Sequence, residues 1–404
     1  MRLAVEPTDA GIETWLNEGL NLEIHQDARQ FRLDRLLAVM PFLPIPPAPC
    51  TITGTKGKGS TARLIECALC AAGQPTVAFT SPHLQRITER WRIDGVDASP
   101  AIIADRALQV IAAEARAGEH LTYFERSFAI AVILACERPG TRFVLEVGLG
   151  GRLDCANVLD AAVVVVTHLS RDHCQLLGPT EVEIAREKLA LCRSSRPLVV
   201  APQSLAGAKA IATTPLPLDV PVTRVTRMQP AFALALLGDH QQDNASTAWA
   251  ALRHFAPEID ECTARRGFAQ ATLAGRCQLV EHGGRRILVD GAHNAASVAA
   301  TLTVAQRSLR PGWQLVMGLA RDKIAEDILP LIPSDLTVRR VGYTSPRARD
   351  EATWPAPARQ WPWSAHIADA LAAMPTEVDL CITGSFYLAG EALHALAPAA
   401  TRME

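Results

Sequence analysis

Thr53-Gly-Thr-Lys-Gly-Lys-Gly-Ser-Thr61 is the stretch that decides the fold, because it places a glycine-rich turn between two regular elements. Before it, Cys50–Thr53 has the composition of a short buried strand, and after it Ser60–Ala72 has the apolar spacing of an amphipathic helix. A glycine turn between a strand and a helix lets successive backbone N–H groups face one anion. The stretch therefore predicts a phosphate loop in an α/β domain.

The residues of this turn suit a phosphate group and its metal ion. The glycines let the backbone bend around an anion, Lys58 adds a positive charge, and a hydroxyl near the helix start can approach Mg²⁺. The candidate nucleotide-binding residues are Gly54, Thr55, Gly57, Lys58, Gly59, Ser60 and Thr61. The strict Walker A pattern has a longer spacer before its Gly-Lys pair. The alternative, a flexible surface turn with two lysines, is disfavoured by the strand and helix on either side.

Short β-branched runs alternate with longer helical stretches along the chain, which indicates an α/β fold around mainly parallel sheets. In the first part we predict further strands at Thr76–Thr80, Phe143–Val147, Val163–Thr167 and Leu198–Ala201, and helices at about 60–72, 102–117, 128–137 and 181–193. A second series has strands at Ile287–Asp290, Gln314–Met317, Leu336–Val341 and Leu380–Thr383. We place the linker at Thr272-Leu-Ala-Gly-Arg276, which gives a large domain of residues 1–274 and a smaller one of residues 275–404.

Charge and hydropathy exclude several classes of protein. The 404 residues carry 40 Lys and Arg against 42 Asp and Glu, without blocks of like charge. The sequence therefore has no excess of basic residues of the kind that binds nucleic acid. An anionic ligand has to be held by local geometry instead. The longest apolar run, Phe128–Cys136, is less than half of the roughly 20 residues that a spanning helix needs. Met1–Asp9 lacks the apolar core of a signal peptide. We therefore expect a cytoplasmic protein with no membrane or nucleic-acid partner.

Polar side chains lie at the ends of several predicted strands, where open α/β sheets bind ligands. Glu146 lies in an apolar strand, and a buried carboxylate there should face a cation, either Mg²⁺ or an arginine. Ser170-Arg-Asp-His173 follows the next strand, so His173 is either a metal ligand or a structural histidine. Asp290-Gly-Ala-His-Asn294 follows a strand of the second domain and is either a ligand site or an Asp/Asn turn.

Two further cations are ambiguous from the residues alone. Lys188 lies in the amphipathic helix Glu183-Ile-Ala-Arg-Glu-Lys-Leu-Ala190, where helix periodicity favours a solvated side chain. Gly275-Arg276 lies at the predicted linker, where it either bridges an anion between the domains or caps the preceding helix.

The set of motifs resembles the folylpolyglutamate synthase and dihydrofolate synthase family, a branch of the Mur ligase superfamily. Gly54–Thr61 is similar to the phosphate loop of that family, and Thr80-Ser-Pro-His-Leu84 with Thr88-Glu-Arg90 is similar to its second block. The resemblance continues in family order at Leu121-Thr-Tyr-Phe-Glu125, Leu145-Glu-Val-Gly-Leu-Gly-Gly-Arg-Leu-Asp154, Asp172-His173 with Leu176-Leu-Gly178, Ile184-Ala-Arg-Glu-Lys188, His240-Gln241 with Asn244-Ala245, Gly275-Arg276, Asp290-Gly-Ala-His-Asn294 and Thr383-Gly-Ser385. It covers nearly the whole chain.

This resemblance implies a Mur-ligase-like phosphate-loop domain and a smaller Rossmann-like carboxy-terminal domain. It also implies an ATP-dependent, ADP-forming acid–amino acid ligase with Mg²⁺. The carboxylate of a pteroate or folate would be phosphorylated to an acyl phosphate, which the nitrogen of L-glutamate then attacks. The implied partners are small molecules, and we expect a monomer.

The resemblance further implies roles for individual side chains. Lys58, His173 and Lys188 are the implied catalytic residues, and Lys188 matches a lysine that relatives carbamylate, which turns a cation into a metal-binding anion. The implied metal ligands are Ser81, Glu146, His173 and Lys188. The implied ATP contacts outside the phosphate loop are Asn244, Arg276, Asp290 and His293, and those to the acid substrate are Thr122, Tyr123, Phe124, Arg152 and Asp154.

Three positions depart from the family pattern. Phe31-Arg-Leu-Asp-Arg35 lacks the glycine that is usual in the segment that helps to hold the pterin. Ala295 replaces a usual proline, and Lys56 replaces a frequent asparagine. The missing glycine permits a second function, a ligase recruited to join a different acid to an amino acid. A nucleotide-binding regulatory protein without ligase activity would require the loss of metal or phosphate-loop residues, and none of those residues is lost.

Overall fold

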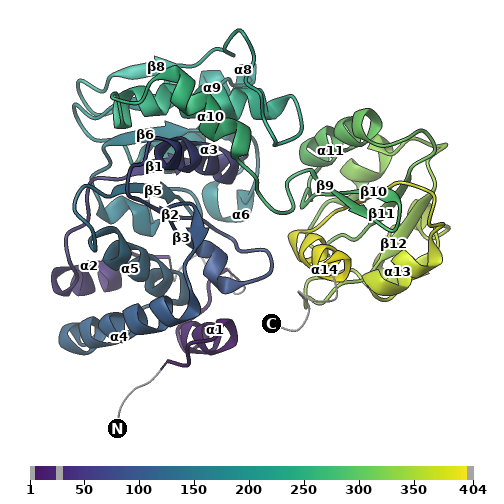
Figure 1. The fold of residues 1–404 in the computed structure, drawn as a ribbon, viewed down its shortest axis with the longest axis horizontal. Helices are drawn as coiled ribbons and strands as arrows, with labels where there is room; N and C mark the ends of the chain where they lie inside the picture. Colours follow the sequence, from purple (N-terminus) through teal and green to yellow (C-terminus); the bar gives the residue numbers. More distant parts are fainter. Residues whose placement is uncertain (1–4, 24–30, 398–404) are drawn as a thin grey trace. The chain divides into compact units, whose positions relative to one another are not determined.

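The computed structural model of this protein describes residues 5–23 and 31–397 (Figure 1). Residues 1–4, part of the Met1–Asp9 stretch in which we expect no signal peptide, lie outside the described residues. The described chain divides into two compact units. One takes in the chain up to Ala235 and His240–Ala271, and the other takes in Leu236–Asp239 and the chain from Thr272 onward. Asp239 is bound to the second unit, because its Oδ2 accepts a hydrogen bond from Arg307 Nη1 at 2.8 Å.

The described part of the first unit is built on an eight-stranded sheet with the order β4-β3-β2-β5-β1-β6-β7-β8. In the part of the sheet ordered β2-β5-β1-β6-β7-β8, neighbouring strands are parallel. β3 pairs antiparallel with β2 at one edge, and β4 pairs antiparallel with β3. The strands are β1 Cys50–Thr53, β2 Thr76–Phe79, β3 Trp91–Ile93, β4 Val96–Asp97, β5 Arg142–Glu146, β6 Val163–Val166, β7 Leu198–Val200 and β8 Val222–Arg224. The predicted mainly parallel sheet is confirmed, and the short strands β3, β4 and β8 are additions to it.

The register of the central strands brings polar residues to one edge of this sheet. β1 lies between β5 and β6, with Ile52 opposite Glu146 and Thr53 opposite Val166. β5 in turn pairs with β2, with Leu145 opposite Phe79. Because these strands are parallel, the residues that follow each of them emerge at the same carboxyl edge.

The helices described in the first unit pack in groups (Figure 1). One group contains α3, α9 and α10, another contains α1, α2, α4 and α5, and α6, α7 and α8 pack together. The helices are α1 Asp9–Asn17, α2 Asp34–Val39, α3 Lys58–Ala71, α4 Pro100–Ala117, α5 Tyr123–Ala135, α6 Cys174–Leu177, α7 Glu181–Leu189, α8 Leu205–Thr213, α9 His240–Phe255 and α10 Glu261–Gln270, with 3-10 turns at Met40–Phe42, Ile87–Arg90 and Cys155–Val158.

Helix α5 explains the long apolar run in the sequence. It is buried nearly all round, because it packs against β2 as well as against α1 and α4. A helix that is hydrophobic on every side belongs in a protein core. Phe128 in α5, together with Phe79 and Trp91 from the sheet, lies in an apolar core cluster of the unit. Across the described chain, no helix has both the length and the apolar character needed to cross a bilayer.

The described part of the second unit is a smaller α/β unit with a six-stranded sheet, in the order β13-β12-β11-β14-β10-β9. All of its neighbouring strands are parallel except β9, which forms an antiparallel hairpin with β10. The strands are β9 Gln278–His282, β10 Arg285–Val289, β11 Gln314–Met317, β12 Val338–Val341, β13 Trp363–Ser364 and β14 Leu380–Thr383. The helices are α11 Ala295–Ser308, α12 Ala325–Ile328, α13 Ile367–Ala373 and α14 Phe386–Leu396, with 3-10 turns at Leu329–Leu331, Glu351–Thr353 and Ala356–Ala358.

Candidate active site

The phosphate loop runs from the end of β1 to the start of α3 and requires glycine at two positions. Gly54 and Gly57 have φ angles of 139° and 87°, which side chains disfavour. A Cβ atom at Gly54 would lie 1.9 Å from Thr167 Oγ1, and one at Gly57 would lie 2.3 Å from Asn244 Oδ1. Glycine is therefore needed both for the backbone shape and for the close approach of neighbouring side chains.

Hydrogen bonds fasten the phosphate loop to the segment that follows β6. The N–H groups of Thr55 and Lys56 both donate to the carbonyl of His168, each at 3.1 Å. Thr55 Oγ1 donates to the carbonyl of Ser170 at 3.0 Å. The loop is therefore preformed at the N-terminus of the 14-residue helix α3, where backbone N–H groups and the helix dipole attract an anion. The sequence offered no reason to expect that the His168 carbonyl holds the loop. The sequence feature that could have indicated it is the position of His168 shortly after β6, which pairs with β1.

Polar groups around the loop fit the phosphates of a nucleotide. Ser60 and Thr61 are buried near the start of α3, and Thr61 Oγ1 has no hydrogen-bond partner within the described part of the chain. Because an unpaired buried hydroxyl is costly, a phosphate oxygen or a metal ion there would supply a missing interaction. Asn244 of α9, which lies against Gly57, donates from Nδ2 to Gln241 Oε1 at 2.9 Å.

Two lysine side chains meet at the carbonyl oxygen of Gly54. Lys188 Nζ donates to it at 2.8 Å and Lys58 Nζ at 3.3 Å. Although periodicity favours a solvated lysine, Lys188 is only 4% exposed, and its Nζ lies against the phosphate loop at Gly54. Burial and, to a smaller extent, the charge of Lys58 lower the pKa of Lys188 to about 7. Near neutral pH much of this amine is therefore uncharged and nucleophilic.

The structure brings together two of the predicted metal ligands, Ser81 and Glu146. Glu146 ends β5, and Ser81 follows the neighbouring strand β2 after one intervening residue. Glu146 is 4% exposed, and its Oε2 accepts the backbone N–H of Ser81 at 3.2 Å. A carboxylate and a hydroxyl are the kinds of oxygen ligand that Mg²⁺ prefers. This pair therefore fits a Mg²⁺ ion at the edge of the sheet that also carries the phosphate loop.

His173 lies in the segment after β6, directly before the short helix α6. Its backbone is left-handed, with φ 49°, and its Nε2 lies 4.0 Å from Asp172 Oδ1. Among residues 5–23 and 31–397, no three His, Cys, Asp or Glu side chains are grouped so that they could hold a metal ion. Since Mg²⁺ is commonly held by one or two carboxylates and by substrate phosphates, a Mg²⁺ site needs no such group. The role of His173 as a ligand stays a prediction.

Asp154 holds the glycine turn that follows Glu146. Its Oδ2 accepts the N–H groups of Gly148 and Leu149 at 3.0 and 3.1 Å, and its Oδ1 accepts the N–H of Ala156 at 2.9 Å. Burial raises the pKa of Asp154 to about 6, although these hydrogen bonds act in the opposite direction. Arg152, in the same turn, is more exposed and donates from Nε to Glu187 Oε1 at 2.7 Å. Asp154 thus shapes the turn from within, whereas Arg152 lies at its surface.

The three predicted substrate contacts at the start of α5 have different environments. Thr122 is the N-cap of the helix, and its Oγ1 accepts the N–H of Glu125 at 3.3 Å. Tyr123 is buried, with the Arg90 guanidinium 5.1 Å from its ring centre. Phe124 is partly buried against the glycine turn, because a Cβ at Gly148 would lie 2.6 Å from its ring.

Asp290 organises the predicted ATP-binding residues of the second unit. Its Oδ2 accepts the N–H of Cys277 at 2.7 Å, and its Oδ1 accepts the N–H of Ala292 and the hydroxyl of Thr301, both at 2.8 Å. These bonds fix the two segments that carry the other predicted residues, since Arg276 precedes Cys277 and His293 follows Ala292.

Arg276 and His293 both contact the ring of Phe386, the first residue of α14. The Arg276 guanidinium lies 4.1 Å from the centre of that ring, and the His293 ring lies 5.6 Å from it. His293 Nδ1 also lies 2.9 Å from the carbonyl of Gly291. Within the second unit, the predicted residues therefore gather at the carboxyl ends of β10 and β14.

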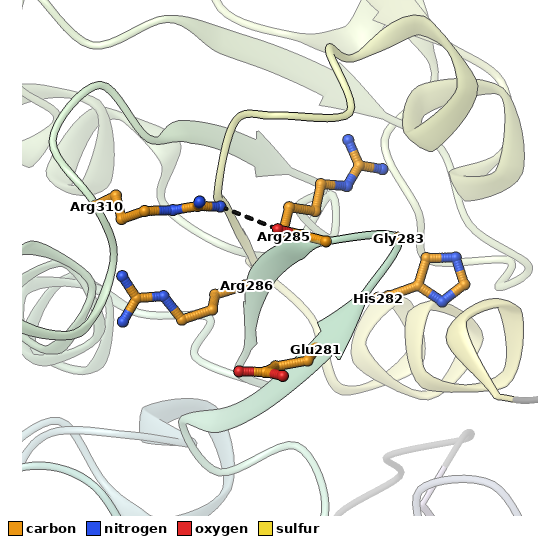
Figure 2. A pocket seen from close by; sticks show the side chains of 7 residues that line it. Glu281, His282, Gly283, Arg285, Arg286 and Arg310 are labelled. Carbon is orange, nitrogen blue, oxygen red and sulfur yellow. Dashed lines mark hydrogen bonds between the residues drawn. The ribbon is translucent and has the colours of Figure 1, made fainter.

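A cavity of about 380 Å³ lies elsewhere in the second unit, at the hairpin between β9 and β10. Figure 2 shows the arginine side chains that line it, with Arg310 crossing toward the hairpin. Arg286 and Arg310 form ion pairs with the buried carboxylate of Asp379 at 3.3 and 2.5 Å, and Arg285 donates to the carbonyl of Pro375 at 2.9 Å. Because these guanidinium groups already bind protein oxygens and the lining includes none of the predicted site residues, we assign the cavity a structural origin.

Comparison with known proteins gives closely related sequences, although no protein-family model matches the chain. It is 36% identical over 332 residues to the dihydrofolate synthase/folylpolyglutamate synthase of Escherichia coli K12, an alignment that covers 77% of each protein. It is 30% identical over 351 residues to the Haemophilus influenzae protein of the same name, covering 77% of this chain and 79% of the relative.

Solved structures of this group have the same fold. E. coli FolC in complex with DHPP and ADP has a TM-score of 0.81 at 28% identity, covering 97% of this chain and 98% of the other. Mycobacterium tuberculosis folylpolyglutamate synthase complexed with ADP has a TM-score of 0.80 at 27% identity, covering 96% and 98%. The resemblance in the motifs is thus matched over most of the chain in sequence and in fold. The chain belongs to the dihydrofolate synthase/folylpolyglutamate synthase family, ATP-dependent ligases of the Mur ligase superfamily.

Proposed function

We propose that this chain uses ATP to join a pteroate or folate carboxylate to L-glutamate. The γ-phosphoryl group of ATP passes to the carboxylate, which gives an acyl phosphate and ADP. The amino nitrogen of glutamate then attacks the acyl carbon, an amide bond forms, and inorganic phosphate leaves. The names of the relatives support this reaction, as does the similar E. coli structure that holds both DHPP and ADP.

The observation that carries the proposal is the meeting of Lys58 and Lys188 on the Gly54 carbonyl within a preformed phosphate loop. Transfer of a phosphoryl group to a carboxylate brings several negative charges together. Catalysis of such a step consists mainly of positioning and charge neutralisation. The Lys58 cation and the backbone N–H groups of the phosphate loop supply both, and Lys188 lies at the same point of the loop.

Each predicted domain by itself has its own proposed nucleotide contacts. In the domain of residues 1–274, these are Gly54, Thr55, Gly57, Lys58, Gly59, Ser60, Thr61 and Asn244. In the domain of residues 275–404, they are Arg276, Asp290 and His293. Lys58 would bind the transferring phosphoryl group, and Arg276, held against Phe386, would offer its charge and planar face to the nucleotide.

Bound Mg²⁺ would supply charge neutralisation for the phosphoryl group. Ser81 and Glu146 would hold it, and His173 is a further proposed ligand. The shared hydrogen bond keeps Ser81 next to the Glu146 carboxylate.

Lys188 would act as its carbamate. Carbamylation requires an uncharged amine, whose nitrogen attacks the carbon of CO₂ and loses a proton. The pKa of about 7 makes such an amine available near neutral pH. The product is an anion beside the phosphate loop, where it can bind a cation and balance the charge of Lys58.

The acid substrate would contact the start of α5 and the glycine turn, at Thr122, Tyr123, Phe124, Arg152 and Asp154. Phe124 and Arg152 are the members of this set that reach the surface. Thr122, Tyr123 and Asp154 are buried, so they would act mainly by shaping the site.

A second candidate function is the ligation of an acid other than a pteroate or folate. It is favoured by Phe31-Arg-Leu-Asp-Arg35, which lacks the usual glycine. Arg35 from this segment is buried and forms an ion pair with Glu125 at 3.2 Å, so its charge is already bound to the end of α5 that carries the proposed substrate residues.

Turnover by the purified chain tests both functions. The protein is mixed with ATP, Mg²⁺, L-glutamate and dihydropteroate, or with a reduced folate, and ADP and product mass are measured. The first function predicts ADP release that requires both acid and glutamate, and a product heavier by a glutamyl residue. No ADP release with any pteroate or folate, together with release on another acid, would establish the second function instead.

We further propose that the chain acts as a monomer in the cytoplasm on small molecules, without a nucleic-acid or membrane partner. Its near-neutral charge supports the part of this proposal that concerns nucleic acid. Sedimentation at micromolar concentration tests the monomer.

A further inference from the structure

Residues 80–86 connect β2 to the 3-10 turn Ile87–Arg90 and form the Ser81 loop. The carboxylate of Glu89, in that turn, binds this loop. The carboxylate of Glu89 accepts the N–H of Leu84 at 2.7 Å and those of Gln85 and Arg86 at 2.9 Å each. Three successive N–H groups on one carboxylate fix the far end of this loop. Its near end begins at Thr80, directly after β2.

Arg92 of β3 fixes the near end of the same loop. Its Nη1 donates to Thr80 Oγ1 at 3.1 Å and to the carbonyl of Glu89 at 3.2 Å. Its Nε lies 3.0 and 2.9 Å from the two carboxylate oxygens of Glu66, in the helix α3 that begins at the phosphate loop. Arg92 therefore links the phosphate-loop helix to both ends of the Ser81 loop.

Charge balance does not explain why Arg92 is buried. Arg63 Nη1 already lies 3.0 Å from Glu66 Oε2, so Glu66 has a second cation. Arg92 is 6% exposed, and within the described residues its Nη2 has no hydrogen-bond partner despite being buried. Burying a guanidinium with an unsatisfied donor is costly, and buried ion pairs add little net stability. The contacts that Arg92 does make are those that fix Thr80 and Glu89 relative to α3.

We propose that Arg92 is a positioning residue for the metal site of the ligase reaction. Anchored on Glu66, it fixes Thr80 and with it the next residue, Ser81, whose N–H binds Glu146. The spacing between the phosphate loop and the Ser81–Glu146 pair is thereby set before ligands bind. This inference rests on the proposed function, because it takes Ser81 and Glu146 as the residues that hold Mg²⁺.

The test compares variants of the full chain by metal binding, turnover and thermal unfolding. Mn²⁺ binding in the presence of ADP is measured from the electron paramagnetic resonance signal of free Mn²⁺. The Mg²⁺ concentration that gives half-maximal turnover is measured separately from the turnover rate at saturating Mg²⁺. Arg92→Met removes the link, whereas Thr80→Val removes one hydrogen bond and leaves the Arg92–Glu66 pair intact.

Arg126→Met is the matched control. Arg126 is as buried as Arg92, and its Nε donates to the buried Glu114 of α4 at 3.1 Å. Its other side-chain contacts include the carbonyl and ring of Trp15 and the carboxylate of Glu18, not the Ser81 loop. It therefore reports what the loss of a buried arginine does to folding without touching the Ser81 loop.

We expect Arg92→Met to weaken Mn²⁺ binding and to raise the half-saturating Mg²⁺ concentration at least about tenfold, as is usual for residues that orient metal ligands. The turnover rate at saturating Mg²⁺ should fall much less. Thr80→Val should shift both metal measurements in the same direction by a smaller factor. Arg126→Met should lower the unfolding temperature and leave Mn²⁺ binding and the half-saturating Mg²⁺ concentration unchanged.

Arg92→Lys separates positioning from charge. A lysine keeps a cation beside Glu66, but a single ammonium cannot span Glu66, Thr80 and the Glu89 carbonyl together. We expect its metal binding to stay weakened, and wild-type binding in this variant would overturn the proposal. If Arg92→Met does not fold, Thr80→Val and Arg92→Lys still decide the question.

Glu146→Gln distinguishes failure of this inference from failure of the proposed function. If Glu146→Gln leaves Mn²⁺ binding unchanged, the proposed metal site is wrong. If it weakens Mn²⁺ binding while the Arg92 and Thr80 variants bind normally, the metal site stands and Arg92 has only a structural role.

Discussion

Lys58 and Lys188 donate hydrogen bonds to the same carbonyl oxygen, that of Gly54, although they come from two different helices. Two cations on a single acceptor repel each other, and the repulsion is strong where burial excludes water. Part of it is relieved by the lowered pKa of Lys188. A phosphoryl group between the two lysines, or conversion of Lys188 itself to a carbamate, would relieve the rest. The arrangement is therefore poised for the charge that the ligase reaction brings to this loop.

Replacement of Lys58 should abolish catalysis and leave the fold intact. Lys58→Ala removes a charge at the phosphate loop, and the loss of one charge-stabilising group lowers turnover at least about a hundredfold. Initial rates of ADP release measure the loss, and circular dichroism checks the fold. Lys209→Ala, which removes an exposed lysine of α8, is the control and should behave as wild type. Near-normal turnover of Lys58→Ala would remove the phosphate loop from the mechanism.

Lys188→Ala should be nearly inactive and should recover partly with added acetate. The substitution deletes the side chain that would carry the carbamate and leaves a space beside Gly54, which a small carboxylate can enter. The rate is measured with acetate from zero to high millimolar concentration. Lys58→Ala, which keeps Lys188 as the proposed site of the carbamate, should show no recovery. Full activity of Lys188→Ala without acetate would defeat the carbamate assignment.

The lowered pKa of Lys188 predicts a pH-dependent stability difference. The amine binds its proton near pH 10.5 in the unfolded chain but only near pH 7 in the folded protein. Between these values the unfolded state holds more protons, so the wild-type free energy of unfolding rises with pH across this window and is flat below it. Lys188→Met cannot titrate, so at pH 7 it should be more stable than wild type by roughly 2–4 kcal/mol, and the difference should shrink toward pH 10.

Urea unfolding at several pH values in carbonate-free buffer measures this difference. Removal of CO₂ keeps Lys188 as the free amine. Lys209→Met is the control on an exposed helix face. If the stability difference between Lys188→Met and wild type does not change between pH 7 and pH 10, burial does not lower the pKa of the Lys188 amine.

Gly57→Ala should damage nucleotide binding more than its backbone conformation alone explains. The new Cβ would lie 2.3 Å from Asn244 Oδ1, so the loop or Asn244 has to move. Gly140→Ala is the matched control, because its φ of 75° is similar to the 87° of Gly57 but no atom lies within 4 Å of the new Cβ. It should cost about 1 kcal/mol of stability and leave ADP binding unchanged. Calorimetric titration with ADP separates the two, and equal ADP affinity in both variants would contradict the tight packing of the loop.

The sequence alone was sufficient for the regular framework of the protein. Cys50–Thr53, Gln314–Met317 and Leu380–Thr383 are strands with the predicted limits, because short β-branched runs between turns have few other stable conformations. The phosphate loop was equally visible, since its glycines are required by local backbone geometry. The family could be identified from motifs spread along the chain, and the comparisons confirm it.

Local sequence was a poor guide to short edge strands and to side-chain environment. Trp91–Ile93 is a strand because the edge of β2 is available for pairing, and Val96–Asp97 pairs in turn with Trp91–Ile93. No local pattern in the sequence shows that these edges are free. Periodicity favoured a solvated Lys188, but the side chain is buried on Gly54, which is far away in sequence.

Arg92 and Glu66 show the same limit. In the sequence they are two ordinary charged residues, and the tertiary structure makes them a buried link between the phosphate-loop helix and the Ser81 loop. Backbone periodicity is set by residues that are neighbours in the chain. The burial, the pKa and the partners of a single side chain depend on which distant elements pack over it, so tertiary structure alone decided them.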